Sequence, residues 1–276
     1  MKTIYVTDLD GTLLGSGSRL SENTKRALRE LYDRGIVISP ATGRSHNTLD
    51  VLQGASFRGP FVLLGGARIR AASGQQWLYE KTYTVEEARF ILHTMKEVGL
   101  TPFLYTQNAE EDQCIYYERG ADENVLAYVE SQRKKGDGRF YMVESFEEKL
   151  QEKLFFITVR GDVPLLENLL QEFLQNGIYA YLYYGVQMRG VCFLECTPAS
   201  KADGVRELKR ITGAQRIVAF GDNGNDIGLF EAADVRIAVE NATDGLKQCA
   251  DRIIGTNDAD AVVRTIYEME GLTWNF

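Results

Sequence analysis

The fold of this 276-residue chain is decided by the stretch TIYVTDLDGT at residues 3–12. Residues 3–7 are all β-branched or aromatic and predict a strand, which Gly11 ends. Asp8 then lies at the carboxyl end of that strand, and Asp10 lies in the turn after it. In an open α/β sheet, ligands bind at that end of the strands. The stretch therefore predicts an α/β fold with a site built on its first strand.

Asp8 and Asp10 bring two carboxylates close together. Like charges at short distance repel by several kcal/mol when they are desolvated. Such a pair is stable when a cation lies between the two groups or when one carboxyl keeps its proton, and both arrangements point to chemistry. Asp and Gly are also common turn residues, so a solvated turn is the alternative interpretation of these residues alone.

Length and composition favour two domains and a small ligand. The chain exceeds the size that one hydrophobic core usually supports, and 44% of its residues are apolar. The net charge of -8 and the pI near 5.0 argue against nucleic acid or an anionic membrane as the main partner, because an acidic surface repels both. A phosphate-bearing ligand then has to be bound by a local cation.

The sequence shows no membrane or secretory segment. It has no apolar run of about 18 residues, and the strand at 3–7 begins without the apolar h-region of a signal peptide. We therefore expect a cytoplasmic protein. The four cysteines form no C-x-x-C pair, so we expect no zinc site, and we expect Cys192 and Cys196 to be small core residues.

A loop suited to phosphate follows the second predicted strand. A helix with Ser21 as its N-cap precedes the apolar residues 36–38, so the chain forms a β-α-β unit with parallel strands. That strand leads to Ala41-Thr42-Gly43-Arg44, where a hydroxyl and backbone N–H groups can bind a phosphate at the head of a helix. Taken alone, Thr42-Gly43 is an ordinary loop.

Two later stretches carry polar residues of the same kind. Residues 198–201, Pro-Ala-Ser-Lys, lead into a helix, where a lone lysine is normally solvated. The predicted strand 217–220 is followed by Gly-Asp-Asn-Gly-Asn-Asp, residues 221–226. Its acids, Asp222 and Asp226, again place negative charge at the carboxyl edge of the sheet.

Together, these four stretches resemble the four motifs of the haloacid dehalogenase superfamily of phosphohydrolases. Residues 8–12 match the first motif, Asp-x-Asp-Gly-Thr/Val, completely, and residues 221–226 match the fourth. Residues 41–44 and the surroundings of Lys201 are similar to the second and third motifs of the Cof-type branch. Relatives usually have Asn where this chain has Gly65.

The resemblance implies a role for each of these residues. Asp8 would be the nucleophile that becomes an aspartyl-phosphate, Asp10 the general acid and base, and Lys201 the partner of nucleophile and phosphate. The phosphate ligands implied are Thr42, Gly43, Arg44, Lys201 and Asn225. The Mg²⁺ ligands implied are Asp8, Asp10 through its backbone carbonyl, Asp222 and Asp226, an oxygen set that this ion prefers.

Residues 84–189 interrupt the motifs and contain no acid pair or phosphate loop of their own. A capping box at Thr84 opens a helix with one apolar face, and later patterns alternate between strand and helix. The alternating Tyr179, Tyr181, Tyr183 and Tyr184 predict a strand with one ring-bearing face, either for binding or for core packing. The segment resembles the large C2B cap of subfamily IIB.

We therefore expect a Rossmann-like core of residues 1–83 and 190–276 and an inserted α+β cap of residues 84–189. In that core, the strand before Asp8 would lie between the strands that precede Thr42 and Asp222, at a topological switch point.

The predicted function is a Mg²⁺-dependent phosphatase that hydrolyses a small phosphorylated metabolite, expected to be a sugar phosphate, through an aspartyl-phosphate. A phosphomutase of the phosphomannomutase type uses the same residues and is an alternative. A phosphate-binding regulatory module without turnover is the second alternative. The expected partner is a small phosphate ester, with no nucleic acid and no membrane, and the sequence specifies no oligomeric state.

Overall fold

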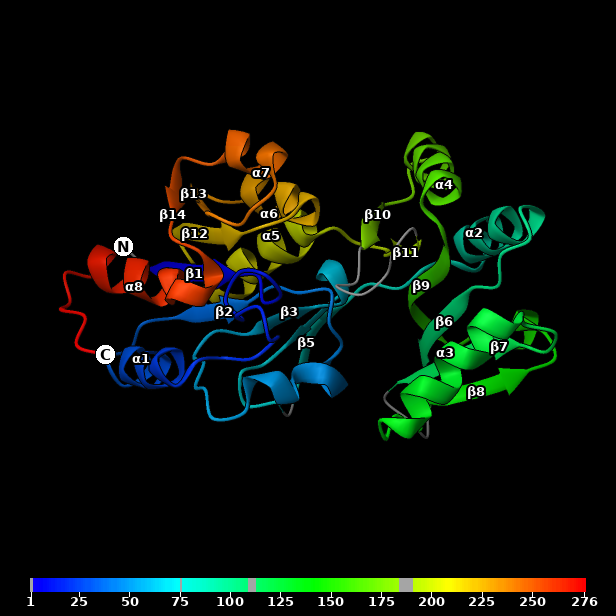
Figure 1. The fold of residues 1–276 in the computed structure, drawn as a ribbon, viewed down its shortest axis with the longest axis horizontal. Coiled ribbons are helices and arrows are strands. Elements are labelled where there is room, and N and C mark those ends of the chain that lie inside the picture. Colours follow the sequence, from blue (N-terminus) through cyan, green and yellow to red (C-terminus); the bar gives the residue numbers. More distant parts are fainter. Residues whose placement is uncertain (1, 75, 109–112, 184–190) are drawn as a thin grey trace. The chain divides into compact units, whose positions relative to one another are not determined.

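The computed structural model describes residues 2–74, 76–108, 113–183 and 191–276, and the chain forms two compact units. Unit 1 consists of Met1–Glu80 and Ala199–Phe276, and unit 2 is the inserted segment Lys81–Pro198 (Figure 1). The chain first passes from unit 1 to unit 2 after Glu80, close to the boundary expected after residue 83. The predicted motifs all lie in unit 1.

A parallel sheet with the strand order β14-β13-β12-β1-β2 forms the centre of unit 1. The strands are β1 (Thr3–Thr7), β2 (Ile38–Pro40), β12 (Arg216–Gly221), β13 (Val235–Val239) and β14 (Arg252–Ile254). All neighbouring strands are parallel, and β1 lies between β2 and β12, as predicted. The carboxyl ends of these three strands therefore meet at one edge.

Helices cover both faces of this sheet (Figure 1). One face carries α1 (Glu22–Asp33) and α8 (Ala261–Met269), which contact each other, and the other carries α5 (Lys201–Thr212), α6 (Ile227–Glu231) and α7 (Asp244–Cys249). The prediction for the start of α1 is confirmed, since the Ser21 side chain accepts a hydrogen bond from the Thr24 amide.

A small antiparallel sheet lies beyond β2. It consists of β3 (Phe61–Leu63), β4 (Arg68–Arg70) and β5 (Trp77–Glu80), and a bridge between Ala41 and Val62 links it to the end of β2. Strands β4 and β5 form an antiparallel hairpin. Short 3-10 helices complete unit 1: η1 (His46–Leu52), η2 (Leu64–Gly66), η4 (Gly224–Asp226) and η5 (Asn257–Ala259).

Unit 2 is an α+β unit built on a mixed sheet with the strand order β10-β11-β9-β6-β7-β8. Its strands are β6 (Phe103–Gln107), β7 (Cys114–Glu118), β8 (Phe140–Val143), β9 (Lys153–Asp162), β10 (Ala180–Tyr183) and β11 (Val191–Cys196). One face packs on α2 (Val85–Glu97) and α4 (Val163–Gln175), and part of the other packs on α3 (Glu123–Lys134). The capping box at Thr84 is present, and η3 (Phe146–Lys149) joins β8 to β9. Within the described ranges, neither unit has a helix with the length and apolar character of a membrane span.

The second predicted domain boundary is wrong. The core was expected to resume at residue 190, but β11 pairs antiparallel with both β9 and β10 of unit 2. Its side chains Cys192 and Cys196 are buried in the apolar core of unit 2, which confirms them as core residues. An apolar strand sequence does not indicate which of two sheets it joins, and the chain returns to unit 1 only at Ala199.

The predicted tyrosine-bearing strand is present as β10. Its register places Tyr181 opposite Glu195 and Tyr183 opposite Phe193, so both rings lie on the same face of the sheet. The prediction for Tyr184 lies outside the described residues.

Candidate active site

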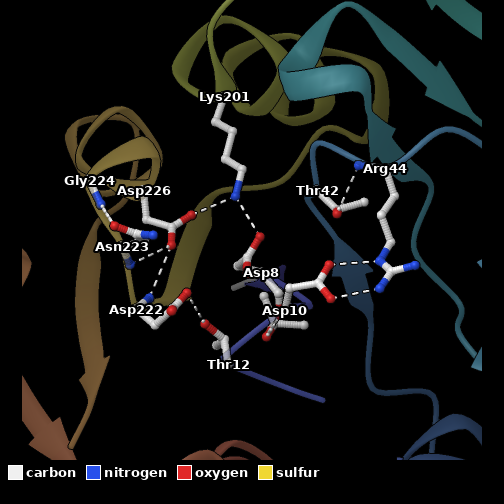
Figure 2. A network of polar contacts seen from close by, with 11 residues as sticks. Asp8, Asp10, Thr12, Thr42, Arg44, Lys201, Asp222, Asn223, Gly224 and Asp226 are labelled. Atoms are coloured by element: carbon white, nitrogen blue, oxygen red, sulfur yellow. Dashed lines mark hydrogen bonds and ion pairs between the residues drawn. The ribbon is translucent and has the colours of Figure 1, made fainter. Parts of the chain in front are cut away.

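The carboxyl ends of three parallel strands bring the predicted residues together. Thr7, the last residue of β1, pairs with Phe220 of β12 on one side and with Pro40 of β2 on the other. Asp8 therefore leaves the sheet between the loop that holds Thr42 and the loop that holds Asp222 (Figure 2). The pairing of these strands alone therefore places Asp8 next to both loops.

Lys201 is the cation at the centre of this site. It is the first residue of α5, its exposed fraction is 1%, and its Nζ donates to Asp8 Oδ1 at 2.5 Å and to Asp226 Oδ1 at 2.6 Å (Figure 2). Burial opposes the charge of Lys201, but the two carboxylates outweigh this effect and raise its pKa. The lysine is therefore a charged group inside the site rather than a solvated residue on a helix.

Two glycines bring the start of α5 against the rest of unit 1. Gly66 has φ +112°, and a Cβ at that position would lie 2.1 Å from the Ser200 carbonyl oxygen. A Cβ at Gly204 would lie 2.6 Å from Cγ1 of Val62. Side chains at either glycine would push the helix away, so this close packing of backbone holds Lys201 over Asp8.

Three carboxylates form the acidic part of the site. Ligand oxygens of Asp8, Asp222 and Asp226 lie within 4.8 Å of one another. Burial raises the pKa of Asp8 well above its usual range, with Asp226 and Asp222 adding to the effect and Lys201 opposing it. Burial and then Asp226 raise the pKa of Asp222 to about 6. The raised pKa values mean that these two carboxyl groups are stable in the ionised form only when a further cation binds them. Their oxygens are the ligands that a hard divalent ion such as Mg²⁺ prefers.

Asp226 also organises the loop that carries Asp222. Its Oδ2 accepts hydrogen bonds from the amides of Asp222 (3.0 Å) and Asn223 (3.2 Å), while its Oδ1 accepts from Lys201. Asp226 is fully buried. Its role as a metal ligand stays a prediction, because both oxygens already have partners within the protein.

The Asp10 carboxylate is turned toward Arg44 instead of the other acids. Arg44 donates from Nε and Nη2 to the two oxygens of Asp10, each at 2.7 Å, and the exposed fractions of the side chains are 34% for Asp10 and 23% for Arg44 (Figure 2). Arg44 Nη1 also donates to the Thr48 carbonyl at 3.2 Å. The implied phosphate ligand and the implied general acid are therefore a bidentate pair.

The loop at Thr42 is held by hydrogen bonds of its own backbone and hydroxyl. The buried Thr42 hydroxyl accepts a hydrogen bond from the Arg44 amide at 3.1 Å, and the Thr42 amide donates to Val62 at 2.9 Å. Among the described residues, none accepts a hydrogen bond from the amides of Gly43 or Leu9. These N–H groups directly follow Thr42 and Asp8, where they can bind an anion.

Asn225 lies in η4, next to Asp226, and is partly buried. Its side chain makes no hydrogen bond to another residue in the described part of the chain. Its contact with phosphate therefore stays a prediction.

The sequence-based site lacked two residues that the structure places beside it. Thr12 donates from Oγ1 to Asp222 Oδ1 at 3.1 Å, and Asn241 donates from Nδ2 to the Gly11 carbonyl at 2.7 Å. Thr12 belongs to the first motif, so its place in that motif was a usable signal. Asn241 follows β13 and carries no local pattern that indicates its partner.

Comparisons with known proteins cover nearly the whole chain. Residues 5–266 match the family described as haloacid dehalogenase-like hydrolase. The chain is 24% identical over 272 residues to the 5-amino-6-(5-phospho-D-ribitylamino)uracil phosphatase YitU of Bacillus subtilis, with 96% of each chain covered. It is 25% identical over 284 residues to the pyridoxal phosphate phosphatase YbhA of Escherichia coli, covering 96% of this chain and 97% of the relative.

Solved structures share the fold. A haloacid dehalogenase-like hydrolase from B. subtilis has a TM-score of 0.78 at 22% identity, with 99% of this chain and 100% of the other covered. The subclass IIB sugar phosphatase BT4131 has a TM-score of 0.73 at 21% identity, covering 98% and 99% of the two chains. Matched from the first motif to α8, the chain belongs to the haloacid dehalogenase-like hydrolases, as a phosphoric monoester hydrolase of that family.

Proposed function

We propose that this chain is a Mg²⁺-dependent phosphatase that hydrolyses a small phosphorylated metabolite, expected to be a sugar phosphate, through an aspartyl-phosphate on Asp8. One observation carries the proposal: the buried Asp8 carboxylate contacts Lys201 and lies beside Asp222. Burying a charged carboxylate costs free energy that its pairing with Lys201 only partly offsets, so an acid in this position points to a function for its charge. A carboxylate that attacks a negatively charged phosphate needs a neighbouring cation such as Lys201.

Asp8 would begin the reaction by attacking phosphorus in line with the leaving oxygen. A bond forms between an Asp8 oxygen and phosphorus, while the bond from phosphorus to the alkoxide breaks. The Lys201 ammonium and the amides of Leu9 and Gly43 offset the charge on the other phosphate oxygens. Mg²⁺, when bound by Asp8, Asp222 and the Asp10 carbonyl, adds charge neutralisation and orientation.

Asp10 would move the protons of both steps. In its protonated form it gives its proton to the leaving alkoxide, and it then regains a proton from the water that attacks phosphorus, which releases phosphate and restores the Asp8 carboxylate. In the structure, both Asp10 oxygens accept hydrogen bonds from Arg44. A dianionic ester offers the same guanidinium a second acceptor of matching geometry. Arrival of substrate therefore competes for Arg44 and frees Asp10 to take up from water the proton that it then transfers.

Unit 2 would select the substrate. Every residue assigned above to phosphate lies in unit 1, and unit 2 contributes none of them. Contacts to the part of the substrate that does not react raise discrimination between esters. The names of the relatives, which refer to a ribitylaminouracil phosphate, pyridoxal phosphate and sugar phosphates, support a small phosphorylated metabolite as the class.

The test is phosphate release from p-nitrophenyl phosphate and from a panel of sugar phosphates, with and without Mg²⁺. We expect Mg²⁺-dependent turnover that Asp8→Asn abolishes, because the amide keeps the shape of the side chain but is not a nucleophile. Asp33→Asn is the matched control, since Asp33 is an exposed acid at the end of α1. Turnover that requires a bisphosphate activator would instead identify a mutase, and binding of phosphate without any turnover would identify a regulatory module.

A further inference from the structure

We propose that Asn241, in the loop between β13 and α7, is a positioning residue that fixes the geometry of the metal site. The inference rests on the proposed function, because it assigns a role relative to Mg²⁺. Asn241 lies 230 residues from its partner Gly11 in the chain. Neither the four motifs nor the proposed reaction gives it a task.

The Asn241 amide joins two backbone segments. Its Nδ2 donates to the Gly11 carbonyl at 2.7 Å, and its Oδ1 accepts from the Asn257 amide at 2.9 Å. A backbone carbonyl only accepts and a backbone N–H only donates, so both ends of the side chain are fixed by their partners. Asn241 thus ties the turn after Asp10 to η5.

The Gly11 turn is packed directly on the Asp222 carboxylate. Gly11 has φ +81°, and a Cβ at this position would lie 2.3 Å from Asp222 Oδ2. The next residue, Thr12, donates to the other oxygen of Asp222 at 3.1 Å. A shift of the Gly11 turn is therefore transmitted to the Asp222 side chain.

The loop of Asn241 also holds Asp222 from its backbone. The Thr243 amide donates to the Asp222 carbonyl at 2.8 Å. Residues 241–243 therefore contact both the Gly11 turn, which follows Asp10, and the backbone of Asp222. These two segments supply the Asp10 carbonyl and the Asp222 carboxylate, so their spacing is set by the Asn241 loop.

Mg²⁺ is sensitive to such spacing because it demands near-ideal octahedral geometry with short bonds. Groups that orient the ligands typically change metal affinity by about 10–100-fold when they are removed. Asn241 is exposed, so truncating it opens no cavity in the core. Its loss is expected to act on metal affinity rather than on the fold.

The same stretch of chain offers a matched control. Asn257 donates from Nδ2 to the Leu14 carbonyl at 2.8 Å, so it ties down the first-motif loop beyond the Gly11 turn. Its side chain makes no hydrogen bond to Gly11 or Asp222. Removing this side chain tests whether Mg²⁺ binding weakens whenever the first-motif loop loses a hydrogen bond, wherever that bond lies.

The experiment measures Mg²⁺ binding by titration calorimetry on the full chain, without substrate, for wild type, Asn241→Ala and Asn257→Ala. We expect Asn241→Ala to raise the Kd for Mg²⁺ about tenfold, and Asn257→Ala to change it less than about twofold. The thermal midpoints of the metal-free proteins should agree. Turnover of p-nitrophenyl phosphate by Asn241→Ala should need correspondingly more Mg²⁺ and recover at saturation.

The inference is overturned if Asn241→Ala binds Mg²⁺ as wild type does, or if Asn257→Ala weakens binding equally. If Asn241→Ala does not give the circular dichroism of the folded protein, Asn241→Leu, which is close in size and lacks both hydrogen bonds, decides by the same criterion. Wild type that binds no Mg²⁺ overturns the metal part of the proposed function as well. Wild type that binds Mg²⁺ without hydrolysing esters overturns the proposed function alone, and the binding data then still decide the role of Asn241.

Discussion

Arg44 donates one hydrogen bond to each carboxylate oxygen of Asp10, and both are 2.7 Å long. The planar guanidinium matches the carboxylate, so the pair fixes the direction of the Asp10 side chain. The motifs implied separate tasks for the two residues, one for phosphate and one for protons. The structure couples the tasks, because the group that would bind substrate also holds the acid that would act on it.

Replacing Arg44 should therefore affect both binding and proton transfer. We expect Arg44→Ala to lower kcat/KM for a sugar phosphate roughly 10–100-fold, the range of a lost charge-assisted bond. Arg44→Lys should recover only part of the loss, because an ammonium cannot make the bidentate contact. Steady-state rates from pH 5 to 9 test this, and equal activity of the Lys variant and wild type would contradict it.

The two acids of the first motif should fail in different ways. Asp8→Ala removes the proposed nucleophile and should abolish turnover. Asp10→Ala should still be phosphorylated by p-nitrophenyl phosphate, because an aryl leaving group needs little protonation, and should then hydrolyse the intermediate slowly. Mass spectrometry of the quenched Asp10→Ala protein should detect phosphorylated Asp8. An unmodified protein during measurable turnover would show that the roles are assigned wrongly.

The Mg²⁺ affinity should depend on pH through Asp222. Its pKa in the metal-free protein is about 6, and a bound cation requires the ionised carboxylate, so below that pH each ion displaces a proton. We expect the apparent affinity to fall up to about tenfold per pH unit below pH 6 and to level off above about pH 7. Calorimetry at several pH values tests this, and excess EDTA should abolish activity at all of them. A constant affinity from pH 5 to 8 would exclude Asp222 as the titrating ligand.

The same carboxyl predicts how stability changes with pH when metal is absent. The pKa of Asp222 rises from 3.8 to about 6 on folding, so the native state binds more protons between these values. Its contribution to the free energy of unfolding is therefore present below about pH 4 and is lost as the pH rises through 6. In EDTA, the thermal midpoint of Asp222→Asn should rise relative to that of wild type as the pH increases from 4 to 7. A constant difference would contradict the prediction.

The contact between η2 and α5 should be intolerant of a single methyl group. Gly66→Ala would place a Cβ 2.1 Å from the Ser200 carbonyl oxygen at φ +112°, and we expect a loss of more than about 2 kcal/mol in the free energy of unfolding. Gly213 is the control, since it also has positive φ, of +65°, but no atom within 4 Å of its Cβ position. Gly213→Ala should cost about 1 kcal/mol. Urea unfolding compares them, and equal losses would show that the contact is not responsible.

Unit 2 should control the choice of substrate without controlling the chemistry. Replacing Lys81–Pro198 by a short Gly/Ser linker should leave slow, Mg²⁺-dependent cleavage of p-nitrophenyl phosphate and remove the ranking of sugar phosphates by kcat/KM. Circular dichroism first establishes that the shortened protein is folded. If it keeps the ranking of the full chain, loops of unit 1 determine specificity, and Gly65 is the first candidate.

Much of the fold could be predicted because its signals are local. The strand before Asp8 and the caps at Ser21 and Thr84 follow from a few neighbouring residues, and each is present. The sheet that β11 joins was predicted wrongly, because pairing is decided by distant strands and an apolar strand suits either unit. Local pattern gave the existence of that strand and not its partner.

The site, like the fold, has a part that local sequence predicts and a part that it does not. Motif residues identify which side chains gather, but the burial of Lys201 depends on the remote glycines 66 and 204. The Asp10–Arg44 pair joins residues 34 positions apart, and the Asn241–Gly11 bond spans 230 positions. Contacts of this kind arise only from the folded chain, so no spacing in the sequence indicates them.

The strand order β12-β1-β2 has a consequence for how the protein is made. On the ribosome, β1 is synthesised before unit 2, whereas β12 begins at Arg216, after unit 2 is complete. Until then, one side of β1 has no strand beside it, and an unpaired apolar edge of this kind favours aggregation. Unit 2 is one continuous segment and can fold as it emerges. The newly made chain therefore carries Asp8, the proposed nucleophile, long before Lys201 and Asp222 are synthesised, and we expect activity only after residues 199–276 have completed unit 1.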